Sequence, residues 1–210
     1  MKAFIYSGGE IYPENITEHP KASDICIAAD SGFANAKALG ERVDIALGDF
    51  DSLSGGAGSI PDGVEKLTVP AEKDETDTQL AVNVALSKGA DDIVIVGGLS
   101  GRLDHTLSNL ALLEALFDLG VPAVILDGRN RARYIRSTST LIPRSGYKYL
   151  SLLAGDEKVK GVSVEGCKYP LKNKNLTKKY QYTVSNEIKE NCALVSVRRG
   201  GLFILESRDV

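Results

Sequence analysis

Residues 43–52 read Val-Asp-Ile-Ala-Leu-Gly-Asp-Phe-Asp-Ser, a stretch in which two acids directly follow an apolar run. The run has the length and composition of a buried strand in a parallel sheet. In open α/β sheets the ligand crevice lies beyond the carboxyl ends of the strands, so we expect Asp49 and Asp51 where a ligand binds. Paired carboxylates suit Mg²⁺, a hard cation that takes oxygen ligands. A solvated Asp-rich turn is an equally good interpretation of this segment alone.

The first 136 residues alternate short apolar runs with helical patterns. Strands are expected at residues 3–6, 25–29, 43–47, 64–69, 93–96 and 123–126, and helices at 34–39, 76–87 and 107–119. Repetition of strand, helix and strand predicts a parallel sheet covered by helices on both faces, which is a Rossmann-like three-layer α/β fold.

The pattern changes near residue 137. Short β-like segments are expected at residues 147–153, 159–164, 180–183, 193–197 and 202–205, separated by polar or glycine-containing turns. They predict an antiparallel β-sandwich or barrel. We therefore expect two domains, an α/β domain at 1–136 and a β domain at 137–210.

Charge divides between the same two parts of the chain. Residues 1–136 hold 12 Lys and Arg against 21 Asp and Glu, whereas residues 137–210 hold 13 against 7. An acidic part can recruit a metal and a basic part can attract anions, although scattered lysines also protect exposed sheet edges from aggregation.

Composition narrows the class of protein. The 210 residues are 43% hydrophobic and 25% charged, as in ordinary globular proteins, and no segment approaches the ~20 apolar residues of a membrane span. The chain enters its first expected strand too early for a secretory signal, so a cytoplasmic location is expected. Three cysteines without metal-ligand spacing predict neither a disulfide framework nor a zinc site. Nucleic acid is not an expected partner, because the basic residues form no dense tract interleaved with aromatics.

Two further acidic segments precede expected helices. Asp30 closes the strand at 25–29, where it can face a ligand or cap the helix that follows. Residues 72–77 read Glu-Lys-Asp-Glu-Thr-Asp, and Thr76 is spaced from Gln79 as in a capping box. Acids in a first helical turn are also favoured by the helix dipole. Asp77 is nevertheless a candidate third carboxylate of a magnesium site.

A glycine-rich segment follows the strand expected at 93–96. Residues 97–102 read Gly-Gly-Leu-Ser-Gly-Arg, so backbone N–H groups can approach phosphate oxygens and Arg102 can offer them a fork of donors. The glycine spacing fits neither a dinucleotide fingerprint nor a P-loop. Asp104 and His105 follow, and His105 is either a general base or a hydrogen-bonded histidine at a helix start.

These segments bring a set of charged residues to neighbouring strand ends along one sheet edge, namely Asp30, Asp49, Asp51, Asp77, Arg102 and Asp104. Acids gathered with an arginine and glycines indicate a metal-bridged polyphosphate. Phosphoryl-type transfer needs placement and charge neutralisation more than covalent chemistry from the protein.

The order of these motifs resembles that of the thiamine pyrophosphokinase family. The matching stretches are Ala-Asp-Ser-Gly at 29–32, Leu-Gly-Asp-Phe-Asp-Ser at 47–52, Lys-Asp-Glu-Thr-Asp at 73–77, Gly-Gly-Leu-Ser-Gly-Arg-Leu-Asp-His at 97–105, Gly-Cys-Lys-Tyr-Pro-Leu at 166–171 and Ser-Asn-Glu at 185–187. The resemblance extends from about residue 25 to residue 208. Each motif alone is modest, but their joint order and spacing are specific.

The resemblance implies an enzyme that moves a diphosphoryl group from ATP to the hydroxyethyl oxygen of thiamine, giving thiamine diphosphate and AMP. It implies that Asp49, Asp51 and Asp77 hold Mg²⁺ and act with Arg102 in catalysis. The residues implied at the nucleotide or its phosphates are Asp30, Lys73, Thr76, Arg102, Asp104 and His105. Ser185 and Asn186 are implied at thiamine, in a homodimer whose thiamine site lies between subunits.

The chain departs from the family in two respects. Some members stack a tryptophan on the pyrimidine ring of thiamine, and this chain has no tryptophan. Many bacterial members have Gln-like or Asn-like side chains where this chain carries Lys73. Two alternatives remain open from the sequence, a pyrophosphokinase for another hydroxymethyl heterocycle such as a pterin, and a non-catalytic nucleotide or thiamine sensor.

Overall fold

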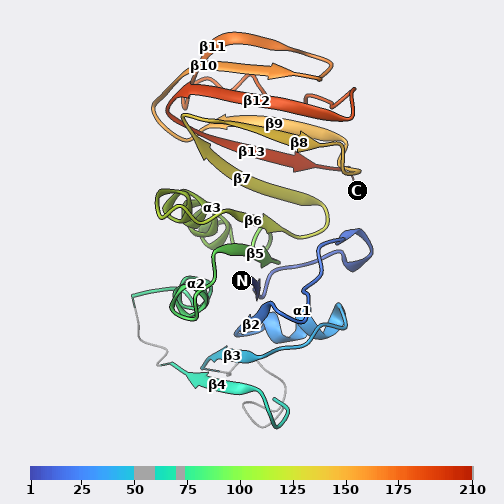
Figure 1. The fold of residues 1–210 in the computed structure, drawn as a ribbon, viewed down its shortest axis with the longest axis vertical. Coiled ribbons are helices and arrows are strands. Elements are labelled where there is room, and N and C mark those ends of the chain that lie inside the picture. The colour runs from blue at the N-terminus through green and yellow to red at the C-terminus, as the bar shows by residue number, and fades with distance from the viewer. Residues whose placement is uncertain (50–59, 70–73, 210) are drawn as a thin grey trace. The chain divides into compact units, whose positions relative to one another are not determined.

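A computed structural model describes residues 1–49, 60–69 and 74–209 (Figure 1). The chain forms two compact units. Unit 1 comprises Met1–Leu112 and Leu119–Gly128, and unit 2 comprises Leu113–Asp118 and Arg129–Val210. Each unit has its own set of strands, and they are described in turn.

Unit 1 contains a parallel sheet. Its strands in the described residues are β1 (Lys2–Tyr6), β2 (Ile25–Ala29), β3 (Ile45–Gly48), β4 (Glu65–Thr68), β5 (Asp92–Val96) and β6 (Ala123–Leu126). They lie in the order β4-β3-β2-β1-β5-β6, and each neighbouring pair is parallel. The chain runs outward from β1 to β4 and then resumes with β5 on the other side of β1. The strand order therefore reverses between β1 and β5, where open α/β sheets form their crevice.

Helices flank these strands. They are α1 (Gly32–Ala38), α2 (Asp77–Ser87) and α3 (Leu103–Asp118), and a short 3-10 helix covers Pro13–Asn15. Figure 1 shows α1 and α2 on opposite sides of the strands, which confirms the expected three-layer arrangement. The backbone N–H of Gln79 donates to Oγ1 of Thr76 at 3.2 Å, so Thr76 is the N-cap of α2. The N-cap position of α1 is occupied by Ser31, and Asp30 lies one residue before it.

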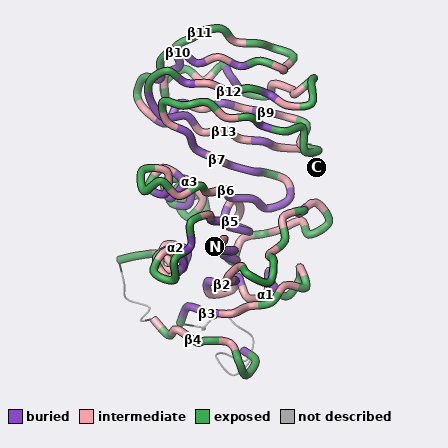
Figure 2. The backbone as a smooth tube through the Cα atoms, in the orientation of Figure 1, coloured by how far each residue is buried: buried purple, intermediate pink, exposed green. Residues whose placement is uncertain are grey.

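The core of unit 1 lies where alternate strand residues meet the helices. Phe4 and Tyr6 of β1 pack with Ala36 of α1 and with Val94 and Val96 of β5. Because successive strand residues point to opposite faces, Ala3 and Ile5 serve the other face of the same sheet, and both are buried. Figure 2 shows buried residues along the inner strands of unit 1, whereas the edge strand β4 is largely exposed.

Unit 2 is an antiparallel β-sandwich. Its strands are β7 (Asn130–Arg136), β8 (Ser139–Pro143), β9 (Tyr149–Ala154), β10 (Lys158–Glu165), β11 (Leu171–Thr177), β12 (Cys192–Arg199) and β13 (Gly201–Ser207). One layer has the order β7-β13-β9 and the other β11-β10-β12-β8, with antiparallel pairing throughout. Buried residues of both layers form one cluster that includes Leu152, Ile204, Val162 and Val195. The expected antiparallel β fold of the later part of the chain is confirmed.

The strands and helices expected in the α/β part are confirmed, with shifts of a few residues at their ends. The start of α3 at Leu103, four residues earlier than expected, was missed. In unit 2, β7, β8 and β11 were missed. β7 carries three arginines, and β11 is an edge strand whose exposed lysines break the apolar alternation. The strand expected at 180–183 is wrong, because there only Tyr180 forms an isolated bridge.

No helix in the described part of the chain is both long and apolar enough to cross a membrane.

Two glycines allow the carboxyl ends of β1, β2 and β5 to approach closely. A Cβ atom on Gly32 would lie 1.9 Å from the carbonyl oxygen of Tyr6, and a Cβ atom on Gly9 would lie 1.9 Å from the carbonyl oxygen of Gly97. Real side chains do not tolerate such distances from backbone atoms. The strand ends are therefore packed backbone against backbone.

We predict that Gly32→Ala destabilises the protein although alanine usually favours a helix. Overpacking at this site should lower the free energy of unfolding by about 1–3 kcal/mol, measured from the midpoint of urea unfolding. Ala34→Gly, at an exposed position of the same helix, is the control. There alanine should be the more stable residue by about 0.5–1 kcal/mol. A stabilised Gly32→Ala variant would contradict the close packing.

Candidate active site

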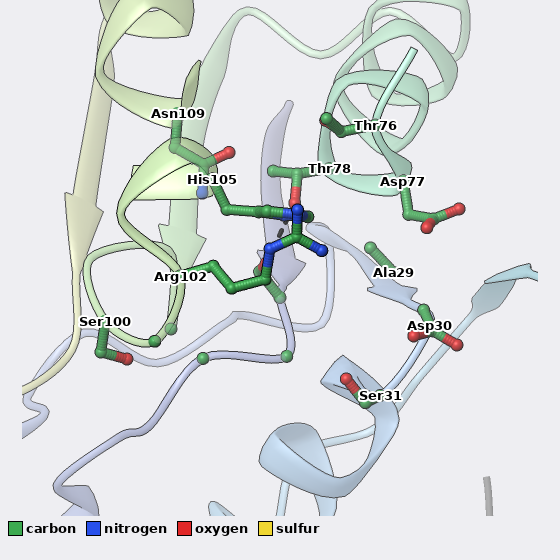
Figure 3. A pocket seen from close by; sticks show the side chains of 15 residues that line it. Ala29, Asp30, Ser31, Thr76, Asp77, Thr78, Ser100, Arg102, His105 and Asn109 are labelled. Atoms are coloured by element: carbon green, nitrogen blue, oxygen red, sulfur yellow. Dashed lines mark hydrogen bonds between the residues drawn. The ribbon is translucent and has the colours of Figure 1, made fainter. Parts of the chain in front are cut away.

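A cavity of about 300 Å³ lies in unit 1 where the strand order reverses (Figure 3). Its walls come from the segments that follow β1, β2 and β5 and from the first turns of α2 and α3. The lining residues are Ser7, Gly8, Gly9, Ala29, Asp30, Ser31, Thr76, Asp77, Thr78, Gly97, Ser100, Gly101, Arg102, His105 and Asn109. The position agrees with the crevice that a doubly wound sheet offers to ligands.

The segment Ser7-Gly8-Gly9 forms one wall, and the sequence analysis missed it. Asn35 of α1 holds this segment, because its Nδ2 atom donates to the carbonyl oxygens of Ser7 and Gly9 at 2.6 and 2.7 Å. The hydroxyl groups of Ser7 and Thr78 lie 2.9 Å apart and join the wall to α2. The available signal was the glycine pair directly after the first strand, since glycines let backbone approach a ligand.

Among the residues that the structure describes, Asp30 and Asp77 are the carboxylates that line the cavity. Asp77 is the first residue of α2, and Asp30 follows β2 with a φ angle of +48°, a conformation uncommon outside glycine. Figure 3 shows both acids on the opposite side of the cavity from Arg102 and His105. Backbone strain of this kind gathers at functional sites, where the surrounding structure maintains it.

Of the other predicted acids that the structure describes, Asp49 and Asp104 do not line the cavity. Asp49 directly follows β3 and is exposed, while Asp51 and Lys73 lie outside the described residues. Within residues 1–49, 60–69 and 74–209, no three His, Cys, Asp or Glu side chains are grouped so that they could hold a metal. Mg²⁺, however, commonly uses one or two protein carboxylates together with substrate phosphates. Asp30 and Asp77 supply carboxylate oxygens, which is the donor type that such a site uses.

Arg102 reaches the cavity while paired with Asp104. Nη2 of Arg102 lies 2.6 Å from Oδ2 of Asp104, and Nε lies 3.2 Å from Oδ1. The hydrogen bonds from the Arg102 guanidinium, with one from the backbone N–H of His105, lower the pKa of Asp104 to about 2. Asp104 is exposed outside the lining, so its contact with the cavity is through Arg102. A guanidinium at this wall can bind phosphate oxygens.

Two residues at the start of α3 and one at α2 complete this site. His105 lines the cavity from the first turn of α3, and Asn109 is buried behind it, donating to the carbonyl oxygen of Gly98 at 2.9 Å. Thr76 also lines the cavity, although its Oγ1 atom already accepts the capping hydrogen bond.

A second cavity, of about 250 Å³, lies in unit 2. It is lined by Leu150, Leu152, Val164, Tyr169, Leu171, Tyr182, Thr183, Val184 and Asn186. Its walls are mainly apolar, with two exposed tyrosines, Tyr169 and Tyr182. Asn186 is therefore at this cavity, whereas Ser185 is exposed beside it with a φ angle of +58°. The backbone N–H of Ser185 donates to Oγ of Ser151 at 2.9 Å.

Two family models match this chain. Residues 17–125 match the model described as thiamin pyrophosphokinase, catalytic domain, and residues 138–202 match the model described as thiamin pyrophosphokinase, vitamin B1 binding domain. The chain belongs to the thiamine pyrophosphokinase family. This confirms the resemblance found in the sequence and the prediction of an enzyme of this type. The catalytic-domain match contains Asp30, Asp77, Arg102 and His105, and the other match contains the whole lining of the second cavity.

Individual relatives agree with the thiamine pyrophosphokinase assignment. The chain is 30% identical over 212 residues to thiamine pyrophosphokinase from Bacillus subtilis (strain 168), covering 98% of each chain. The crystal structure of thiamine pyrophosphokinase from Bacillus subtilis matches with a TM-score of 0.87 at 26% identity, covering all of both chains. That of thiamin pyrophosphokinase from Geobacillus thermodenitrificans matches with a TM-score of 0.85 at 27% identity, covering 100% of this chain and 98% of the other.

We predict that Asp104 stays ionised to unusually low pH because Arg102 favours its charged form. Since the pKa in the folded protein is lowered, the pair is intact at neutral pH and is lost only as the pH falls to about 2. Arg102→Ala should move the pKa of Asp104 up towards 3.8, as followed by NMR titration of its carboxyl carbon. Arg199→Ala, at an exposed arginine of unit 2, should leave that titration unchanged. An equal shift in both variants would contradict the assignment.

Proposed function

We propose that this protein transfers a diphosphoryl group from ATP to the hydroxyethyl oxygen of thiamine, giving thiamine diphosphate and AMP. The observation that supports it is the cavity of unit 1, where Asp30 and Asp77 face Arg102 and His105 beside glycine-rich backbone. A polyphosphate needs both features, because cations must balance its charge and backbone N–H groups must reach its oxygens.

The nucleotide would occupy this cavity. We assign Arg102 to the phosphates, with Asp104 orienting its guanidinium, and His105 and Thr76 to the same wall. Asp30 would contact the nucleotide from the end of β2. Lys73 is proposed as a further phosphate contact from the segment before α2, by family resemblance, although it lies outside the described residues.

Magnesium is the cofactor that we propose. Asp77 would hold it from the cavity, together with Asp49 after β3 and Asp51 in the segment that follows. When bound, Mg²⁺ neutralises charge on the polyphosphate and orients it. Asp30, the other carboxylate of the cavity, is the residue best placed to share this role.

The reaction is an in-line displacement at the β-phosphorus. The hydroxyl oxygen of thiamine forms a bond to that phosphorus, and the bond from the β-phosphorus to the oxygen bridging it to the α-phosphorus breaks. The bridging oxygen and its electron pair leave with AMP, and the hydroxyl proton passes to an acid of the cluster and then to water. Arg102 balances the negative charge that develops on AMP, which is electrostatic stabilisation by a positioned donor.

Thiamine would meet unit 2 at the second cavity. Ser185 and Asn186 belong to this region, and the exposed rings of Tyr169 and Tyr182 offer aromatic surface in a chain that has no tryptophan. A tyrosine face can stack on a heteroaromatic ring as a tryptophan face does. The proposal includes a cytoplasmic homodimer, as the family resemblance implies.

Diphosphoryl transfer can be tested with ATP labelled at the γ-phosphorus. The purified protein with thiamine and Mg²⁺ should place the label in thiamine diphosphate and release one AMP for each product. ADP and thiamine monophosphate would instead indicate transfer of a single phosphoryl group. Binding of ATP and thiamine without turnover would identify a sensor, and preferential use of a hydroxymethylpterin would identify a different pyrophosphokinase. Removal of divalent ions with EDTA should stop turnover, and added Mg²⁺ should restore it.

We predict that Asp77→Asn lowers kcat by about 100-fold or more, the scale of losing a charged group that organises a reacting phosphate. The Mg²⁺ concentration for half-maximal rate should rise as well. Asn at this helix start should leave the fold intact, which circular dichroism can verify. Asp62→Asn, at an exposed turn before β4, is the matched control and should stay within about twofold of the wild type. Near-normal activity of Asp77→Asn would refute the proposed role of Asp77 in holding Mg²⁺.

A further inference from the structure

The side-chain amide of Asn186 is bound to the protein's own backbone. Its Nδ2 atom donates to the carbonyl oxygen of Tyr169 at 2.8 Å, and its Oδ1 atom accepts from the backbone N–H groups of Tyr169 at 3.0 Å and Glu187 at 2.9 Å. An asparagine amide has two N–H donors and an oxygen with two lone pairs. Both acceptor positions and one donor of Asn186 are therefore engaged.

The backbone of Asn186 is fixed from the other side. Its N–H donates to the carbonyl oxygen of Leu150 in β9 at 3.0 Å, and its carbonyl oxygen accepts from the N–H of Leu150 at 2.8 Å. Asn186 thus joins β9 to Tyr169, which lies in the connection between β10 and β11. The side chain of Asn186 hydrogen-bonds both the N–H and the C=O of Tyr169. It therefore makes the hydrogen bonds that a neighbouring strand would otherwise make with Tyr169.

Tyr169 needs such a support because its own side chain is largely outside the core. Tyr169 as a whole is 59% exposed, and it lines the cavity of unit 2. We call the hydrogen bonds between the Asn186 side chain and the Tyr169 backbone the clamp. Lys168 and Glu187, the residues next to Tyr169 and Asn186 in the chain, also form a pair. Nζ of Lys168 lies 5.3 Å from the centroid of the Tyr169 ring and 3.0 Å from Oε1 of Glu187. The pair Lys168 and Glu187 is exposed and adds little, since such pairs are screened by water. The segment before Tyr169 is also held by backbone, because the N–H of Lys168 donates to the carbonyl oxygen of Glu187 at 2.9 Å. The N–H and the C=O of Tyr169 itself both hydrogen-bond the amide of Asn186.

We infer that Asn186 is a positioning residue, which holds Tyr169 at the mouth of the unit 2 cavity so that the tyrosine ring contacts the aromatic ring of thiamine. This rests on the proposed function for the identity of the ligand. The clamp replaces direct recognition of thiamine by the Asn186 amide, most of whose hydrogen-bonding capacity is already taken by backbone. Without the clamp the ring of Tyr169 is still present but is poorly positioned, so the affinity for thiamine falls.

A double-mutant cycle separates the clamp from direct contact. Asn186→Ala, Tyr169→Ala and the double variant are assayed with the full chain, Mg²⁺ and saturating ATP. We expect Asn186→Ala to raise KM for thiamine about tenfold with KM for ATP nearly unchanged, and the double variant to be no worse than Tyr169→Ala. Independent effects that multiply in the double variant would overturn the inference.

A thiamine analogue gives a second comparison. If the Asn186 amide bound the pyrimidine amino group, Asn186→Ala would weaken discrimination between thiamine and an analogue that carries an oxo group there. The clamp predicts an equal loss for both compounds. A selective loss for thiamine would therefore overturn the inference.

Hydrogen exchange tests the clamp without any activity. In the ligand-free chain, Asn186→Ala should speed exchange of the Tyr169 N–H, because its acceptor is removed. Asn186→Asp keeps a carboxylate acceptor and should retain part of that protection and part of the thiamine affinity. Asn191→Ala, at an exposed asparagine just before β12, is the matched control and should change neither measurement. If exchange of the Tyr169 N–H is unchanged in Asn186→Ala, the clamp is overturned. If exchange changes as expected but the wild-type protein shows no turnover with ATP and thiamine, only the proposed function is refuted.

Discussion

The site of unit 1 depends on backbone packed directly against backbone at the ends of β1, β2 and β5. A side chain at Gly9 or Gly32 would fall within 1.9 Å of a carbonyl oxygen, so only glycine permits these strand ends to close on one another. The segment Ser7-Gly8-Gly9 can then be held by Asn35, whose amide binds two of its carbonyl oxygens. Because the strand order also reverses between β1 and β5, the closed strand ends border a cavity rather than a continuous surface. The segments that follow β2 and β5 bring Asp30 and Arg102 to that border.

Charge in this cavity is arranged before any ligand arrives. Arg102 makes a two-point contact with Asp104, and Asp30 and Asp77 lie on the opposite wall. A polyphosphate bound as we propose would meet the guanidinium of Arg102 on one side and the carboxylate oxygens of Asp30 and Asp77 on the other. Phosphoryl-transfer enzymes depend on the placement of charge around the transferred group more than on covalent chemistry. Asp104 is therefore best understood as a support for Arg102.

In unit 2, as in unit 1, an asparagine side chain holds a segment of backbone beside a cavity. An exposed tyrosine on a strand connection has few packing contacts to hold it, and the side chain of Asn186 supplies the hydrogen bonds that a neighbouring strand would otherwise provide. In both units, then, an asparagine side chain bound to backbone fixes a loop beside a cavity. Asn35 does so for the glycine-rich wall and Asn186 for Tyr169. Amide side chains suit this task because they both donate and accept.

The amino-acid sequence by itself determined the features that depend on near neighbours. Apolar runs bounded by Gly, Asp and Pro located the six strands of unit 1, and the spacing of Thr76 and Gln79 correctly predicted a cap. The order of motifs was enough to indicate the family. The sequence did not show β7 and β11, whose charged residues conceal the alternation of a strand. Nor did it show that Asn35 supports Ser7 or that the Asn186 amide hydrogen-bonds the backbone of Tyr169. Only the tertiary structure decided these pairings, because strand order and register bring distant residues together and each polar group then bonds to whichever partner the fold places within reach.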